Sequence, residues 1–273
     1  MMRCHILMRD RRNASIHEGF VRVISVTALP GSVDNFAKHQ LSGAMFLEPE
    51  RDQSSRELSG KAQPFPVPER IPLFPLPNLV FFPKTYLPLH VFEPRYRQMV
   101  ADAAAGGQCI GMALLKEGWE EQYDGNPPIF SIGCVGRLAS VQALPDGRSN
   151  ILLQGLERYE IHEEFYEKSY REARVALKPR EGAVSMEPAL RRYLTDVLDE
   201  YLKADEEASP LHSLVRPDVS DEVFVNSLST YLDCTPLEKQ FLLEADHVPQ
   251  QARRLSDLIQ FKLAERHGAG GWG

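Results

Sequence analysis

Residues 71–83, with the sequence IPLFPLPNLVFFP, constrain the fold of this chain more than any other segment. The run is apolar enough to be buried, yet four of its thirteen residues are proline. Each proline fixes φ at about −65° and removes a backbone donor, so the run suits neither a helix nor a central strand. We therefore predict an extended, kinked ribbon at a sheet edge or barrel rim, with large side chains on alternate sides.

Two interpretations of this ribbon are open. In the first, the ribbon is only the edge that closes a barrel. In the second, it is a surface that receives an extended partner, because an alternating ribbon cannot bury both faces unless a second layer covers it. We therefore expect part of this apolar surface to stay open, and an open apolar surface generally marks an interaction site.

The charge balance limits the partners. Residues 70–273 carry 22 Lys and Arg against 30 Asp and Glu, a net charge of −8 within a chain of net charge −7. Binding to nucleic acid needs clustered Lys and Arg that neutralise phosphates, so we expect no nucleic-acid partner. No stretch reaches the roughly 18 apolar residues of a membrane span, so we expect no membrane partner either.

The cysteines and the amino terminus indicate the compartment. The four cysteines lie far apart without a Cys-x-x-Cys pair, and the first residues contain no apolar region of secretory length. This pattern argues against a disulfide scaffold or a zinc site, and it suits a reducing, cytoplasmic environment. We expect Cys109 and Cys134, which lie in apolar runs, to be small core residues.

Three sections of the chain differ in pattern. Residues 1–66 show no sustained period, and we predict a largely disordered extension with one short strand within residues 20–26. Met45 is a plausible true start of the protein. Residues 67–180 read mostly as β, with strands predicted near 86–92, 109–115, 129–144, 149–154, 155–161 and 171–177. One helix interrupts them, with Glu93 as its cap, Pro94 at its first position and a stop at residues 106–107.

After residue 180 the apolar period changes to 3.6 residues. Apolar stripes within 190–202, 224–232 and 255–263 predict three helices, and the capping box at Thr235 and Glu238 opens another. We assign a helical bundle to residues 181–267, ended by Gly268, and a flexible tail to residues 268–273. The predicted fold class is α+β: a small twisted β barrel with one inserted helix, followed by a carboxy-terminal helical bundle.

The search for catalytic motifs gives nothing. The chain lacks a phosphate-binding loop, a dinucleotide fingerprint, a nucleophile elbow and a zincin motif. His90 and His162 stand alone in strand contexts, where a histidine is more often structural than catalytic. We therefore expect no enzymatic activity, no metal and no cofactor.

Several separate motifs, in order and spacing, resemble the amino-terminal, substrate-binding domain of Lon-type ATP-dependent proteases. The proline-rich run matches the family's opening, and residues 87–89 match its Pro-Leu strand. A helix with an arginine, a glycine-containing strand, a Pro-Asp-Gly hairpin and a Gly-Leu-x-Arg turn follow. The resemblance covers about residues 70–266, and its motif residues are Pro75, Pro83, Pro88, Glu93, Arg95, Gly133, Gly136, Asp146, Gly147, Gly155 and Arg158.

The resemblance implies a PUA-like pseudobarrel followed by a helical bundle. In full-length Lon this module engages unfolded polypeptides and helps to assemble the oligomer. The present sequence ends where the ATPase and Ser-Lys peptidase domains of Lon would begin, so ATP binding and proteolysis are not implied. It is similar to the free-standing Lon-domain proteins of bacteria, in which a role in protein quality control is expected.

Our leading hypothesis is a non-enzymatic module that binds unfolded or extended polypeptides as an adaptor or weak chaperone. The partners would be such polypeptides and a Lon-type protease, together with weak self-association. Strand addition is the expected mode of binding. The predicted binding residues are the large side chains of the ribbon and of the strand and helix after it: Phe74, Leu76, Val80, Phe82, Leu87, Leu89, Phe92 and Tyr96.

Two other functions were weighed against this hypothesis. An RNA-binding role follows from the PUA-like character, but the charge of −8 argues against it. A hydrolase with an unrecognised site would need a deep polar pocket in which His, Cys and carboxylate groups converge.

Overall fold

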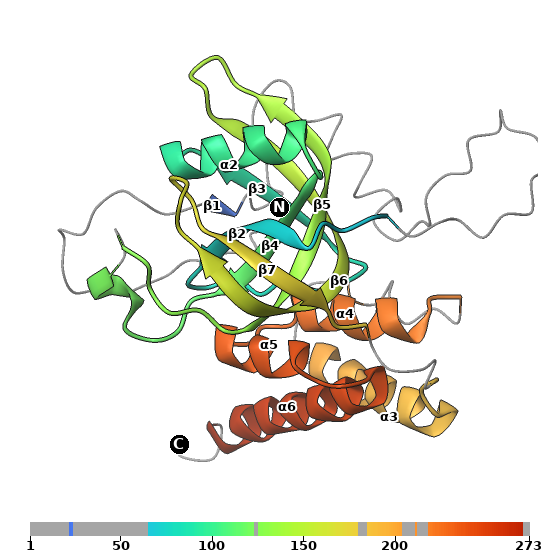
Figure 1. The fold of residues 1–273 in the computed structure, drawn as a ribbon. Helices are drawn as coiled ribbons and strands as arrows, with labels where there is room; N and C mark the ends of the chain where they lie inside the picture. Colours follow the sequence, from blue (N-terminus) through green and yellow to red (C-terminus); the bar gives the residue numbers. More distant parts are fainter. Residues whose placement is uncertain are drawn as a thin grey trace, which may run out of the picture.

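The fold is α+β, as predicted (Figure 1). A computed structural model describes residues 22–23, 65–122, 125–179, 185–203, 211 and 218–269. The predictions of disorder and of a later start concern residues 1–66, almost all of which lie outside the described residues. Of the strand predicted within residues 20–26, the structure describes β1 (Arg22–Val23).

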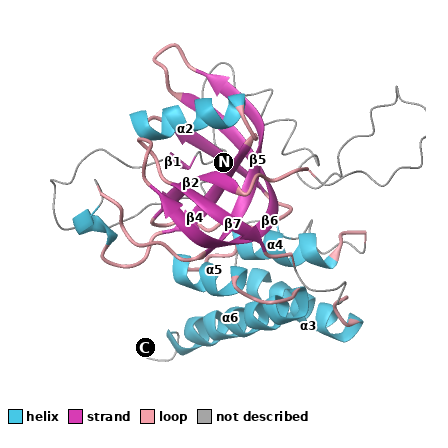
Figure 2. Cartoon of the chain, viewed as in Figure 1, coloured by secondary structure: helices cyan, strands magenta, loops and turns pink. Residues whose placement is uncertain are grey.

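The described strands form one sheet that closes on itself. The order is β1-β3-β6-β5-β4-β2-β7, and an additional pairing of β7 with β6 completes a barrel. Strand β3 pairs with β6 outside this ring and carries β1 on its other side, so the sheet is a pseudobarrel. Figure 2 shows the strands in magenta, with α2 on one side of them and the carboxy-terminal helices at one end. The strands are β2 (Arg70–Leu76), β3 (Tyr86–Val91), β4 (Cys109–Leu114), β5 (Ile132–Ala143), β6 (Ser149–Phe165) and β7 (Glu172–Leu177).

The prediction that the proline-rich run lies at a sheet edge is wrong for its first half. Strand β2 is an interior strand, because residues 70–72 pair antiparallel with β7 and residues 73–76 pair parallel with β4. Strand β2 therefore has a partner strand on each side, although each partner pairs with only part of its length.

The change of partner explains how β2 tolerates two prolines. Backbone groups of successive residues in a strand point to opposite sides. Leu73 donates its N–H to Arg171 of the β7 side at 2.8 Å, so odd-numbered residues face β7 and even-numbered residues face β4. The missing donor of Pro72 faces β4 before that pairing begins, and the missing donor of Pro75 faces β7 after that pairing ends. Neither proline removes a ladder hydrogen bond.

The predicted inserted helix is α2 (Pro94–Ala105), with proline in its first turn and Gly106 as its C-cap. Its buried stripe consists of Tyr96, Met99, Val100 and Ala103. Glu93 is the N-cap residue, but its side chain makes no capping bond, contrary to our expectation. The Glu93 carboxylate instead accepts a hydrogen bond from Arg95 Nε at 3.0 Å.

Four helices follow the barrel and lie together against one end of it (Figure 1). The predicted capping box is confirmed at α5, where Glu238 N–H donates to Thr235 Oγ1 at 3.2 Å and Thr235 N–H donates to the Glu238 carboxylate at 2.6 Å. The last helix passes through Gly268 and ends at Ala269, so the end predicted at residue 267 is two residues early. The helices are α3 (Pro188–Lys203), α4 (Asp221–Tyr231), α5 (Pro236–Leu243) and α6 (Val248–Ala269).

The hairpin β5–β6 also departs from the prediction in one respect. The segments expected as two strands, 149–154 and 155–161, are one strand, β6, that bends at Gly155. A Cβ atom at Gly155 would lie 2.3 Å from the carbonyl oxygen of Phe82, so only glycine fits this close approach. In the predicted turn, Gly147 has φ of +79° and Asp146 accepts the Arg148 N–H at 3.0 Å.

One hydrophobic core joins the barrel to the helices. It contains Phe74 and Leu153 of the barrel as well as Leu198 and Leu255 of the helices. Buried amides add directed contacts across the same boundary: Asn226 Nδ2 donates to the carbonyl of Pro83 at 2.9 Å, and Gln240 Nε2 donates to the carbonyl of Ile132 at 3.0 Å. The sequence pattern changes at residue 180, but the hydrophobic core is continuous across this position.

Arg158 is a further link across this boundary, and it carries a charge. It lies in β6, is 1% exposed, and donates from Nη1 to the carbonyl oxygens of Leu243, at 3.2 Å, and Ala245. Both carbonyls lie at the carboxy-terminal end of α5, where helix carbonyls lack helical partners and the helix dipole favours a cation. Burial lowers the pKa of Arg158, but an arginine remains charged. The motif arginine therefore caps α5 from the barrel.

We predict that Arg158→Met lowers the free energy of unfolding by about 3 kcal/mol, because buried carbonyls lose charged hydrogen bonds worth roughly 1.5–3 kcal/mol each. Urea unfolding measures this change. Arg148→Met is the matched control, since that side chain is 49% exposed in the hairpin, and it should change stability by less than about 0.5 kcal/mol. Equal stability of the two variants would contradict the capping role.

Candidate functional site

The structure places most of the predicted binding residues in the core. Seven of the eight side chains are no more than 9% exposed, so the expectation that they form an open surface is wrong. Phe92, directly after β3, is half-buried and is the exception. Because Phe82 is buried, replacing it with a charged residue would destabilise the fold, and such a variant would not report on polypeptide binding. The seven buried side chains are Phe74, Leu76, Val80, Phe82, Leu87, Leu89 and Tyr96.

Both faces of the proline-rich strand are covered, which is the physical reason for this burial. Ile71 and Leu73 pack with Tyr159 and Val135 in the barrel interior. Phe74 and Leu76 belong to the larger core, in which the Tyr96 ring of α2 lies 4.3 Å from the Phe74 ring, centroid to centroid. The second layer that a two-faced apolar ribbon requires is therefore supplied by α2 and the carboxy-terminal helices.

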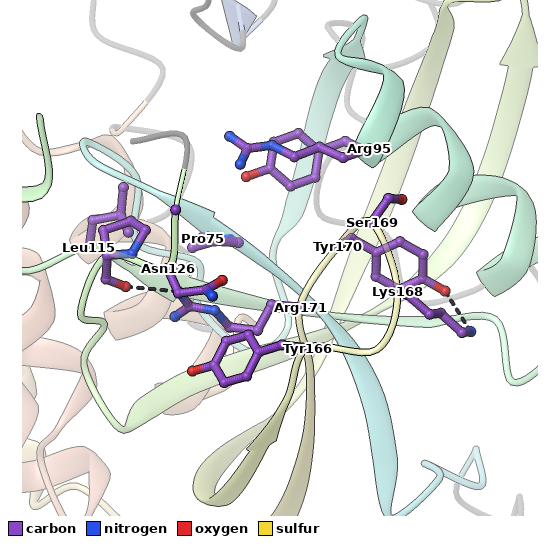
Figure 3. A pocket seen from close by; sticks show the side chains of 12 residues that line it. Pro75, Arg95, Leu115, Asn126, Tyr166, Lys168, Ser169, Tyr170 and Arg171 are labelled. Atoms are coloured by element: carbon purple, nitrogen blue, oxygen red, sulfur yellow. Dashed lines mark hydrogen bonds between the residues drawn. The ribbon is translucent and has the colours of Figure 1, made fainter. Parts of the chain in front are cut away.

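A surface cavity of about 270 Å³ opens where the run meets solvent (Figure 3). Its walls come from the end of β2, the first turn of α2, the loop after β4, and the turn between β6 and β7. Three predicted residues contribute to it: Pro75, Arg95 and Tyr96. The remaining lining residues are Leu115, Gly125, Asn126, Pro127, Tyr166, Lys168, Ser169, Tyr170 and Arg171.

Three tyrosine–cation pairs build the wall of this cavity. The Arg95 guanidinium lies 4.7 Å from the centre of the Tyr96 ring, and Arg171 lies 5.5 Å from that of Tyr166. The third pair joins Lys168 and Tyr170 at 5.1 Å. All three distances are within the range of cation–π attraction. The wall thus presents ring edges and charged groups held in fixed positions.

Arg171 holds two parts of the wall together. Its side chain is 5% exposed, and its Nη2 donates to the carbonyl of Pro127 at 2.9 Å while Nη1 lies 3.1 Å from the Glu164 carboxylate. Figure 3 shows the first of these contacts as a dashed line between the turn and the loop. A single buried guanidinium therefore fixes the loop after β4 against the β6–β7 turn.

The opposite side of the turn is held to α2. The Tyr170 hydroxyl donates to Asp102, and Lys168 Nζ lies 3.2 Å from the same carboxylate. These hydrogen bonds, that of Tyr170 first, lower the pKa of Asp102. Lys168 Nζ also lies 3.3 Å from the Glu172 carboxylate. The pKa of Lys168 is raised, chiefly by the hydrogen bond between Lys168 and Tyr170. The turn is therefore anchored on both sides of the cavity.

The residues of the β6–β7 turn were missed in the sequence analysis. The signal was present as tyrosines at 166 and 170 beside basic residues at 168 and 171. Tyrosine and arginine close together in a hairpin turn are typical of a recognition surface, because both residue types are enriched at interfaces. The sequence patterns predict only a connection between two strands for residues 162–170.

The side chains that line the cavity are aromatic, basic, amide, hydroxyl and small apolar groups. Among its lining residues there is no histidine, cysteine or carboxylate that could pair as nucleophile and base. Within the described ranges, no three His, Cys, Asp or Glu side chains are grouped so as to hold a metal ion.

Away from the cavity, burial raises the pKa of Cys109 to about 11, as expected for a core thiol. None of the helices in the described part of the chain could span a membrane.

Comparisons with known proteins define the class. The family model for the substrate-binding domain of ATP-dependent protease La (Lon) matches residues 70–260, and the chain belongs to this family. Lon protease of Flavobacterium johnsoniae is 27% identical over 191 residues, which are 68% of this chain and 23% of that protein. Lon protease 2 of Myxococcus xanthus is 31% identical over 109 residues, 40% of this chain and 13% of that protein.

Solved structures share the fold. The Lon N-terminal domain protein from Xanthomonas campestris has a TM-score of 0.51 and 21% identity, covering 70% of this chain and 98% of that one. The N-terminal domain of the Lon protease of the Mycobacterium avium complex has a TM-score of 0.56 and 18% identity, with the same coverage. The chain thus spans about a quarter of the length of the Flavobacterium johnsoniae Lon protease.

We predict that Tyr170→Phe raises the pKa of Asp102 toward the ordinary aspartate value of about 3.9, because the largest cause of its lowering is removed. A carboxylate with a lowered pKa stabilises the fold above its ordinary pKa and loses this effect as the pH falls through the lowered value. The Asp102 anchor should therefore weaken at a higher pH in the variant. Carboxyl NMR titration measures the shift.

Tyr166→Phe is the control for this titration. Its hydroxyl donates to Glu164 at 2.8 Å and not to Asp102, so the Asp102 pKa should stay unchanged. An Asp102 pKa that is the same in wild type and Tyr170→Phe would mean that the hydroxyl does not hold the turn.

Proposed function

We propose that this protein is a non-enzymatic module that binds unfolded or extended polypeptide segments, as an adaptor or weak chaperone in the cytoplasm. Membership of the Lon substrate-binding family supports the class of ligand. A Lon-type protease is the proposed protein partner. The charge of −8 over residues 70–273 favours polypeptide over RNA as the ligand.

The observation that carries this proposal is the cavity with its tyrosine–cation wall. At about 270 Å³ it is smaller than the roughly 300–1,000 Å³ of a pocket for a drug-sized ligand. A cavity of this size suits one side chain of a longer segment. Ring edges contact apolar groups, while guanidinium and ammonium groups donate hydrogen bonds to backbone carbonyls, so a mixed wall tolerates many sequences.

The proposal also explains why the anchors around the cavity are ionic. A wall that receives a variable ligand must keep its shape without the ligand, because ordering side chains on binding reduces affinity. Arg171, tied to Pro127 and Glu164, and Lys168, tied to Asp102 and Glu172, fix the wall in advance. We assign to Arg171 and Lys168 a role in positioning, and we assign the direct contact to the ring of Tyr166, which is 51% exposed.

We predict that a chemically unfolded, carboxymethylated model protein binds this chain and that Tyr166→Ala weakens the binding about fivefold. The loss corresponds to one aromatic contact of roughly 1 kcal/mol. Fluorescence anisotropy of the labelled model protein gives the dissociation constants, and the folded form of the same protein should bind much more weakly.

Tyr193→Ala is the matched control, because Tyr193 lies on α3 and is 42% exposed, close to the 51% of Tyr166. It should leave the affinity unchanged. Absence of binding at high micromolar concentration would exclude the function itself. Equal losses in the two variants would exclude the cavity as the contact.

A further inference from the structure

Strand β3 is paired along its whole length by β6 on one side, whereas on its other side only two of its residues have a described partner. The barrel strands β6, β5, β4, β2 and β7 pair in a closed ring, and β3 extends from β6. The sheet order ends at β1, which covers only Leu89 and His90 of β3. The side of β3 away from β6 is therefore the place where a further strand can add to this sheet.

The backbone groups on this open side can be assigned by alternation. Gly155 of β6 donates its N–H to the carbonyl of Thr85 at 2.8 Å, so the odd-numbered residues of β3 face β6. Tyr86, Pro88 and His90 then direct their backbone groups to the open side. Pro88 offers only its carbonyl, which is the usual place for a proline in an edge strand. Tyr86 and His90 each offer a donor and an acceptor.

The same residues form a half-buried row on one face of β3. Burial alternates along the strand, with residues 87, 89 and 91 in the core and residues 86, 88 and 90 half-buried. The row continues to Phe92, whose ring centre lies 6.2 Å from that of His90. His90 Nδ1 lies 2.8 Å from Asn150 Oδ1 of β6, which fixes its ring. An added strand would therefore find aromatic side chains beside its backbone partners.

The chain itself supplies an occupant for this edge. Strand β1 pairs antiparallel with β3, with Arg22 opposite His90 and Val23 opposite Leu89. Because His90 directs its backbone groups to the open side, the Arg22–His90 pair is the hydrogen-bonded one. Val23 and Leu89 form the non-hydrogen-bonded pair, in which the Val23 groups point away from β3. The structure thus contains a case of strand addition at this edge.

We propose that the open side of β3 is a strand-binding surface, and that the chain's own segment at Arg22–Val23 competes there with extended polypeptide. This inference rests on the proposed function for its ligand class. Backbone pairing is blind to sequence, so the edge suits unfolded segments of varied composition. A polypeptide gains access when β1 is released, and its apparent affinity is reduced by the fraction of molecules in which β1 is paired.

Two proline variants of β1 separate pairing from other effects of the segment. Arg22→Pro removes the donor that faces His90, so it should release β1. Val23→Pro removes a donor that points away from β3, so it should leave the pairing in place. Both variants are made in the full chain, and both insert the same residue at adjacent positions.

The first measurement is amide hydrogen exchange at His90. We expect the His90 amide to be protected in wild type and in Val23→Pro, and to exchange about tenfold faster or more in Arg22→Pro. The second is anisotropy with the carboxymethylated model protein, where Arg22→Pro should bind about threefold tighter or more and Val23→Pro should bind as wild type does.

The two measurements fail in distinguishable ways. Equal exchange at His90 in all three chains would overturn the pairing and with it the competition. Faster exchange in Arg22→Pro with unchanged affinity would overturn the competition, while the proposed function would stand. Faster exchange with no polypeptide binding in any chain would overturn the proposed function and leave β1 as a mere closure of the edge.

The receiving strand provides an independent check. His90→Pro removes the open-side donor of β3, whereas His90→Ala removes only the imidazole and its contact with Asn150. In an Arg22→Pro background, the former should weaken polypeptide binding about threefold beyond the latter. Equal affinities in the two His90 variants would place polypeptide binding elsewhere than on this edge.

Discussion

The contact between Arg158 and the end of α5 is the constraint on which the rest of the arrangement depends. A guanidinium that is 1% exposed in β6 must find acceptors, because an unpaired buried cation is very costly. The carbonyls at the end of α5 are the acceptors, and they in turn need a donor. The two requirements satisfy each other only when α5 lies against the barrel. The helices then close one end of the barrel, where Asn226 of α4 bonds the carbonyl of Pro83 at the end of the proline-rich run, while Tyr96 of α2 packs on Phe74 of β2.

Burial of that run shows where reasoning from residues alone stops. The prediction that prolines remove donors and reject a central strand rested on sound chemistry, but it treated the strand as having one partner on each side throughout. In the folded chain β2 changes partner between residues 72 and 73. Each missing donor then faces a side where no partner lies. Such a change is set by the register of β4 and β7, which lie far along the chain, so no local pattern could have revealed it.

The candidate site was partly accessible to sequence and partly not. Pro75, Arg95 and Tyr96 were chosen from the motif at the barrel entrance, and all three reach the cavity. Tyr166, Lys168 and Arg171 lie some seventy residues further on, and they meet the first group only because β7 pairs with β2. The α+β class, the inserted helix and the capping box at Thr235 could be predicted because each depends on contacts within a few residues. The two groups of cavity residues, by contrast, come together only when the barrel closes.

Closure of the barrel also determines where strand addition can occur. We expected strand addition at the proline-rich run, but the backbone groups of β2 pair with β4 and β7. Strand β7 in turn is paired on both sides, by β2 and by β6. Strand β3 keeps an open side in the described part of the sheet, and its Pro88 weakens that edge without abolishing it. In our proposal, the two donors and three acceptors of this edge would bind backbone weakly and without regard to sequence. A cavity that takes one side chain would add selectivity that the edge lacks, so the two proposed surfaces would complement each other.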